Sequence, residues 1–149
     1  MAKFIFRLEN ILQIKYKLEE QRKIEFSIAM NRLNAEQAEL DHLFEMKYYY
    51  EDVLKDLIKE GAKAVELREA SYAIEVTKVR IIYQKERVRI EEENVEVARE
   101  NLNLSMQERK TFEILKEKEF EKFKQEVNAA EMKEVDELVS YKFGVAAKS

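Results

Sequence analysis

The sequence lacks the residues that punctuate a globular fold. Its 149 residues include no proline, no cysteine, no tryptophan and only two glycines, whereas an average chain has about 5% proline and about 7% glycine. Sheets need many turns, and turns need residues with a positive or a fixed φ angle. The missing cysteines exclude disulfide bonds and thiolate metal sites. These absences together predict an all-α chain built from very few elements.

The residues that are present favour long helices packed along a seam. Charged residues make up 39% of the chain and hydrophobic residues 46%, which is too charged for a compact core and too apolar for a disordered tail. No segment approaches the ~20 consecutive apolar residues of a membrane span. Residues 1–15 do not resemble a secretory signal, so we expect a cytoplasmic protein without membrane insertion. The net charge of −4, without a basic stripe, argues against nucleic acid as a partner.

Apolar residues recur with a seven-residue period, which is typical of a coiled coil. The longest row lies in the second half of the chain, and further apolar residues continue it to Ala130: Leu67, Ile74, Ile81, Val88, Val95, Leu102, Met106, Phe112, Phe120, Phe123 and Val127. In the first half the pattern starts at Phe26 and has these members: Ala29, Leu33, Leu40, Leu43, Tyr50, Leu54, Leu57 and Ala64. Ile11, Ile14 and Leu18 form a stripe in another register, joined through Arg22, which predicts a stutter.

Gly61 marks the expected turn between the two stripes, since glycine tolerates the left-handed conformation that ends many helices. The alternative places Gly61 within one continuous helix, at a cost of about 1 kcal/mol relative to alanine. With the turn, the first helix spans about residues 8–60, the turn about 61–67 and the second helix about 68–142. The sequence thus predicts one domain, a long two-helix antiparallel coiled-coil hairpin over residues 1–149.

Catalytic chemistry is not expected, because no constellation of catalytic residues is present. His42, the only histidine, lies in a helical run, where a lone histidine is usually a surface or seam residue. The chain has neither a glycine-rich phosphate loop nor a nucleophile elbow. The carboxylates of residues 91–93 spread around a helix and do not converge. We therefore predict a protein that is not an enzyme and has neither a cofactor nor a metal site.

A second apolar stripe on the second helix trails the main row by two positions, or about 200° around the helix. It would therefore lie opposite the seam. Tyrosine and methionine, which this stripe and the facing part of the first helix contain, are enriched in partner-binding surfaces. A specific partner, a homodimer and a broad seam are all consistent with the pattern. Its members are Tyr72, Val76, Val79, Tyr83, Ile90, Val97 and Leu104, and the first helix adds Met46 and Tyr49 at a similar distance from the turn.

The second helix should also extend past the start of the first. If the turn centres near residue 64, an apolar stripe projects beyond the first helix, with only residues 1–7 available to cover it. Phe4 and Phe6 are the side chains there that could do so. Leaving such side chains exposed forgoes ~1.5–3 kcal/mol each, which predicts a docked partner. The stripe consists of Phe123, Val127, Val135 and Leu138.

The two ends of the chain resemble the FliJ family of flagellar export proteins. Residues 4–15, Phe-Ile-Phe-Arg-Leu-Glu-Asn-Ile-Leu-Gln-Ile-Lys, are similar to that family's opening F-x-F-x-L-x-x-[VI]-L-x-[IVL]-[KR]. Residues 131–138, with Phe143 following, are similar to its closing K-x-[LMV]-D-E-[LI] segment. Val139 and Ser140 depart mildly from the pattern. Together the two segments make the resemblance cover the whole chain.

The resemblance implies a protein of the flagellar type III secretion apparatus, with a hairpin like the stalk (gamma-type) subunit of rotary ATPases. Its implied partners are the export ATPase, the export-gate membrane protein and export chaperones. It implies a location on the cytoplasmic side of the inner membrane, with effects on motility and chemotaxis through filament assembly. A stalk subunit of another rotary ATPase or injectisome, and a generic structural coiled coil, remain alternatives.

We assign candidate sites from these features. The gate is expected on the second stripe, at Met46, Tyr49, Tyr72, Val76, Val79, Tyr83 and Ile90. The export ATPase is expected on the terminal region, at Phe4, Phe6, Leu8, Phe123, Val127, Val135, Asp136 and Leu138.

Overall fold

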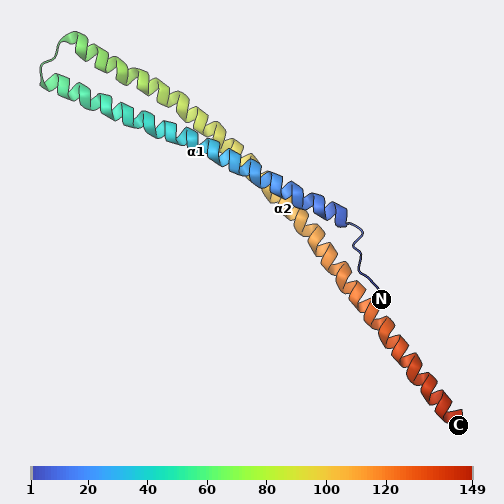
Figure 1. Cartoon of the computed structure of the whole chain (residues 1–149). Helices are drawn as coiled ribbons and strands as arrows, with labels where there is room; N and C mark the ends of the chain where they lie inside the picture. The colour runs from blue at the N-terminus through green and yellow to red at the C-terminus, as the bar shows by residue number, and fades with distance from the viewer. Residues whose placement is uncertain (1, 149) are drawn as a thin grey trace. The chain divides into compact units, whose positions relative to one another are not determined.

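The computed structural model describes residues 2–148, which form two helices, α1 (Glu9–Lys59) and α2 (Ala64–Lys148). No strand occurs among these residues. The chain is therefore all-α, and its two helices make the antiparallel coiled-coil hairpin that the sequence predicts (Figure 1).

The turn between α1 and α2 is short because glycine closes it. Gly61 has a φ angle of 71°, a left-handed conformation that glycine adopts without a Cβ penalty. Its N–H donates to the Ile58 carbonyl at 3.2 Å, and the Ala62 N–H donates to the Leu57 carbonyl at 2.9 Å. This pair of bonds is the Schellman motif, which satisfies carbonyls at the end of a helix. The turn needs only residues 60–63, so α2 begins at Ala64, earlier than the expected residue 68.

The chain divides into two packed units. The turn unit comprises residues 20–103, and the terminal unit comprises residues 2–19 with 104–148. Both contain a stretch of α1 and a stretch of α2. In the turn unit the two stretches lie side by side up to the turn (Figure 1).

The core of the turn unit is the seven-residue row predicted on α2. Ile74, Ile81, Val88 and Val95 are all buried. Ile81 and Val88 form a cluster with Leu40 and Leu43 of α1, and Leu33, Phe44 and Met46 pack against it. Burial of each large apolar side chain stabilises the fold by ~1.5–3 kcal/mol. The predicted main row of the hairpin is confirmed.

A second row of the same seam is polar. Thr77 and Gln84 of α2 are buried, with 2% and 6% of their surfaces exposed. The Thr77 hydroxyl donates to the Ala73 carbonyl at 2.8 Å. The Gln84 amide donates across the seam to the Glu36 carbonyl oxygen at 2.9 Å and also to the Glu36 carboxylate. Buried polar groups need such partners. The polar row therefore contributes oriented hydrogen bonds to the seam, whereas the first row contributes buried apolar surface.

The predicted register of α1 near its start is wrong. Ile14 is 61% exposed and Ile11 is 39% exposed, whereas Leu12 is only 1% exposed. From Leu12 to Leu57 the buried and half-buried positions follow steps of three and four without interruption, so α1 has no stutter. The misreading arose because the true seam positions between residues 13 and 25 are charged: Lys15, Glu19 and Arg22.

Candidate interaction surfaces

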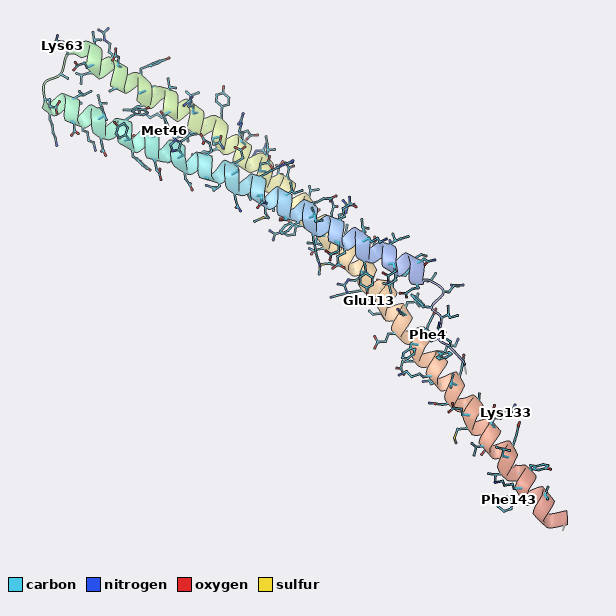
Figure 2. The ribbon with its side chains drawn as sticks, viewed as in Figure 1. Phe4, Met46, Lys63, Glu113, Lys133 and Phe143 are labelled. Atoms are coloured by element: carbon cyan, nitrogen blue, oxygen red, sulfur yellow. The ribbon has the colours of Figure 1, made fainter. Side chains whose placement is uncertain are left out.

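The N-terminal segment of the terminal unit covers part of the apolar row of α2. The ring centroid of Phe4 lies 5.1 Å from that of Phe120 and 5.5 Å from that of Phe123. Phe6 is buried, and Leu8 is half-buried. Figure 2 shows Phe4 beside α2, before α2 continues to Lys133 and Phe143. The predicted covering role is therefore observed in the terminal unit for Phe4, whose ring lies against Phe123.

An ion-pair network crosses the seam of the terminal unit. The Arg109 guanidinium donates to the Glu19 carboxylate at 2.6 Å and to the Glu113 carboxylate at 2.8 Å. The Tyr16 hydroxyl donates to the second Glu113 oxygen. The side chains of Glu19 and Arg109 are only 8% and 17% exposed. The pair thus holds α1 to α2 with oriented hydrogen bonds where a hydrophobic coiled coil would have leucines.

The network shifts the ionisation of its members. The hydrogen bond from Tyr16 is the main reason that the pKa of Glu113 lies below its ordinary value, and the same bond raises the pKa of Tyr16. Glu19 raises the pKa of Arg109. At the start of α1, the Lys116 ammonium 2.8 Å from Glu9 lowers the pKa of that carboxyl. The shifts of Glu9, Glu113 and Arg109 favour the charged forms that the ion pairs need, and the shift of Tyr16 favours the neutral hydroxyl that donates to Glu113.

We expect Arg109→Ala to lower the melting temperature by several degrees. The change leaves the Glu19 carboxylate nearly buried and without its guanidinium, and breaking such a pair from one side is more harmful than replacing both partners. Glu19→Leu with Arg109→Met should therefore melt higher than Arg109→Ala alone. Circular dichroism of the full chain measures both. An Arg109→Ala protein that melts like the wild type would show that the network does not stabilise the hairpin.

From residue 128 to residue 145, no other described segment packs against α2. All side chains from 128 to 145 are exposed, and Lys133 and Phe143 in Figure 2 lie on this uncovered stretch. We call residues 128–145 the overhang. Its acidic candidate, Asp136, is exposed as well. Among its members are apolar side chains that are 45% to 73% exposed: Met132, Val135, Leu138, Val139, Tyr141, Phe143 and Val145.

The structure separates the predicted terminal site into two parts. Phe4, Phe6 and Leu8 lie in the N-terminal segment, and Phe123 and Val127 are half-buried on α2. The remaining candidates, Val135, Asp136 and Leu138, belong to the overhang. An open groove of about 390 Å³ adjoins the first part. Its lining includes Phe4, Leu12, Tyr16, Glu113, Lys116, Glu117 and Phe120.

The second stripe lies on the outer face of α2, opposite the core row. In the turn unit all five α2 residues of this stripe that were assigned to the gate are exposed, from 37% to 72%. The reading of this stripe as part of a broad seam is therefore wrong. We call these residues the outer stripe: Tyr72, Val76, Val79, Tyr83 and Ile90.

The two candidates on α1 differ in their surroundings. Tyr49 is 64% exposed, and its ring centroid lies 5.6 Å from that of Tyr50. Met46 is instead half-buried and packs against the core cluster. The Met46 side chain contributes to the packing of the hairpin core, so Met46 is a poorer candidate for partner contact than Tyr49.

Sequence reasoning overlooked a basic stretch beside the outer stripe. Residues 78–89 contain five basic side chains, Lys78, Arg80, Lys85, Arg87 and Arg89, and one acidic side chain, Glu86. A charge count over a short window, in place of the count over whole segments, would have found it.

Two kinds of site are absent from the described residues 2–148. No group of three or more histidine or acidic side chains there is arranged to hold a metal ion. Neither of the two helices contains a stretch long and apolar enough to cross a membrane.

Comparison with protein families is decisive. The family model described as "Flagellar FliJ protein" matches residues 4–148. The chain belongs to the FliJ family. This FliJ-family chain is thereby associated with type III export, as the two terminal segments indicated.

This FliJ-family chain is also similar to a solved structure. A solved structure of a putative YscO homolog, CT670 from Chlamydia trachomatis, is 18% identical to it, covers 99% of both chains and has a TM-score of 0.49. No curated protein matches the sequence.

Proposed function

We propose that this protein is a non-enzymatic component of the flagellar type III export apparatus that connects the export ATPase to the membrane export gate. The terminal unit binds the ATPase and the outer stripe binds the gate. The protein also escorts export chaperones and is required for flagellum assembly and motility. It works at the cytoplasmic side of the inner membrane, as a peripheral protein. ATP hydrolysis belongs to the partner.

The observation that carries this proposal is the exposed outer stripe in a FliJ-family chain. Soluble proteins rarely leave contiguous apolar surface uncovered unless something binds there. Tyr72 and Tyr83, 72% and 71% exposed, belong to a residue type enriched in interfaces. The seam does not need these side chains, because Ile74, Ile81 and Val88 already fill it.

The overhang supports the assignment of the ATPase. It is a single uncovered helix with apolar side chains at Val135, Leu138 and Val139. A helix of this kind binds by laying its apolar face into a groove of another protein. The apolar surfaces of the two units are therefore available to two different partners.

Val79→Asp with Tyr83→Ser should reduce gate binding and motility without affecting folding. Exposed positions usually change the free energy of unfolding by no more than ~0.5 kcal/mol, and Val79 is 50% exposed. Binding is measured by calorimetry with the purified cytosolic part of the gate, and motility by swimming of a complemented deletion strain. Thermal melting by circular dichroism should match the wild type.

A matched control introduces the same two residue types, Asp and Ser, at exposed apolar positions on α1 of the same unit. Ile24 and Ile28 are 61% and 46% exposed, so Ile24→Asp with Ile28→Ser should preserve melting, gate binding and motility. Full gate binding by the Val79/Tyr83 variant would disprove the gate assignment. If that variant instead loses self-association measured by analytical ultracentrifugation, the outer stripe serves a homodimer.

A further inference from the structure

The centre of the outer stripe, together with the adjacent Ile82, is an apolar ridge with a cationic border. Val76, Val79, Ile82 and Tyr83 are 37%, 50%, 67% and 71% exposed. At 100° per residue, these four side chains fall within about 120° on the face of α2 opposite the core row. We call them the ridge. Arg80 and Arg87 lie along one edge of the ridge, and Lys78 and Lys85 lie along the other.

Among the described residues, the two arginines differ from the other cations of this stretch in having neither an anionic nor an aromatic partner, whereas the Lys85 ammonium lies 5.6 Å from the centroid of the Phe44 ring. Lys78 is 3.2 Å from Glu75, and Arg89 pairs with Glu86 and Glu93. No ion pair of Arg80 or Arg87 is found among the described residues. A guanidinium without a carboxylate in its own chain is available to a partner.

The free arginines line a groove beside Tyr83. An open groove in the turn unit is formed by Arg80, Tyr83, Arg87 and three other side chains, which are Glu39, Leu43 and Gln84. The Gln84 amide is committed to Glu36, so it does not compete for a ligand. Arg80 and Arg87 are seven residues apart, or about 10 Å along α2 at ~1.5 Å per residue. The groove thus presents one guanidinium on each side of the exposed Tyr83 ring.

We propose that the ridge and its arginines bind a protein segment in which apolar side chains are bordered by carboxylates, so the docking surface of the partner is acidic. The inference deepens the proposed function, because it rests on the outer stripe being the gate-binding surface and states what that surface must carry. The apolar side chains pack on Val79 and Tyr83. Two carboxylates, about 10 Å apart, pair with Arg80 and Arg87, whose planar guanidinium groups can bind carboxylates with two parallel hydrogen bonds.

An anionic membrane surface fits this face less well than an acidic protein. Glu75 and Glu86 lie on the outer face of α2 at the two ends of the ridge, where a negative bilayer would repel them. The ridge is also only about 10 Å long, from residue 76 to residue 83 at ~1.5 Å per residue. Helices that lie in a membrane interface carry a continuous apolar face. A protein groove can bind the ridge and leave both carboxylates in water.

Photocrosslinking tests the charge of the partner without assuming its identity. Tyr83 is replaced with p-benzoylphenylalanine in motile cells, and the crosslinked peptide is identified by mass spectrometry. We expect a segment with at least two Asp or Glu residues on one side of an apolar residue and a negative net charge. A neutral or basic segment, a second copy of this chain, lipid alone or no crosslink would each overturn the inference. The identity of the crosslinked protein separately tests the gate assignment.

Substitution of the two arginines tests their contribution directly. Arg80→Gln with Arg87→Gln should weaken binding to the purified cytosolic part of the gate about tenfold near 0.15 M salt, mainly through slower association. The difference should shrink in 1 M salt, where the Debye length falls from about 8 Å to about 3 Å. Circular dichroism should show unchanged melting.

The control variant loses the same number of charges elsewhere in the turn unit. Arg32 and Arg68 are exposed, so Arg32→Gln with Arg68→Gln should change affinity less than about twofold. Equal weakening by both variants would mean that only the net charge matters, and no weakening by the Arg80/Arg87 variant would remove the arginines from the site. If the wild type does not bind the gate at all, the gate assignment fails, and the crosslinked segment decides the acidic-partner inference.

Discussion

Ile81→Asp with Val88→Ser should unfold the turn unit. Both residues are buried in the cluster that joins α1 to α2, with 5% and 6% of their surfaces exposed. Removing a buried aliphatic side chain costs about 2–5 kcal/mol, and an unpaired buried carboxylate adds further cost. Since small domains are stable by only about 5–15 kcal/mol, the double change removes much or all of the stability.

The measurement is thermal and urea unfolding followed by circular dichroism. The Ile81/Val88 variant should have lost most of its helical signal at 37 °C, whereas Val79→Asp with Tyr83→Ser should melt with the wild type. The two variants undergo comparable changes on the same helix, two and five positions apart. If the Val79/Tyr83 variant were the unstable one, the ridge would be core and the face assigned to the partner would be wrong.

The difference between the two faces of α2 could be predicted because one row is uniformly apolar. Ile74, Ile81 and Val88 repeat every seventh residue, and only one face of a helix can sustain that period against a partner. The outer stripe has the same period but contains the tyrosines at 72 and 83. The length of the seven-residue repeat was therefore the correct criterion for deciding which of the two rows forms the seam.

The second row of the seam could not be predicted from hydrophobicity. Thr77 and Gln84 belong to it, yet neither residue type is usually buried. Their burial depends on oxygen atoms that the fold places within reach, such as the Ala73 and Glu36 carbonyls. A sequence shows which residues are polar but not which of them will find partners across a seam.

The same limit explains the error at the start of α1. Ile11, Ile14 and Leu18 look like a seam, but the buried residue there is Leu12 and the next two seam positions are Lys15 and Glu19. Lys15 is held 2.9 Å from Glu108, and Glu19 is held by Arg109. At the start of α1, the apolar residues Ile11 and Ile14 thus lie on the surface, and the residues that form ion pairs lie in the seam. The positions of Arg80 and Arg87 beside Tyr83 likewise required the register that only the structure fixes.

Removing the overhang should abolish binding of the export ATPase while the remainder of the hairpin stays folded. We place the truncation after Ala129, because this cut keeps Phe120 and Phe123 against Phe4 and removes only residues beyond them. Burial of a large apolar side chain is worth ~1.5–3 kcal/mol. The loss of two such contacts, for example Val135 and Leu138, already amounts to about 3 kcal/mol, or about a hundredfold in affinity. Pulldown and calorimetry with the purified ATPase measure this loss.

Substitutions within the overhang show whether the truncated protein binds poorly because it lacks particular side-chain contacts or because its helix is shorter. Val135→Asp with Leu138→Asp should reproduce the binding defect of the truncated protein, because both side chains are more than half exposed and neither supports the fold. Glu134→Gln with Glu137→Gln alters the neighbouring exposed positions and should change affinity less than about threefold. ATPase binding at wild-type affinity by the truncated protein would move the site to the covered part of the terminal unit. There Phe4 and the adjoining groove are the remaining candidates, and Phe4→Ala becomes the variant to measure.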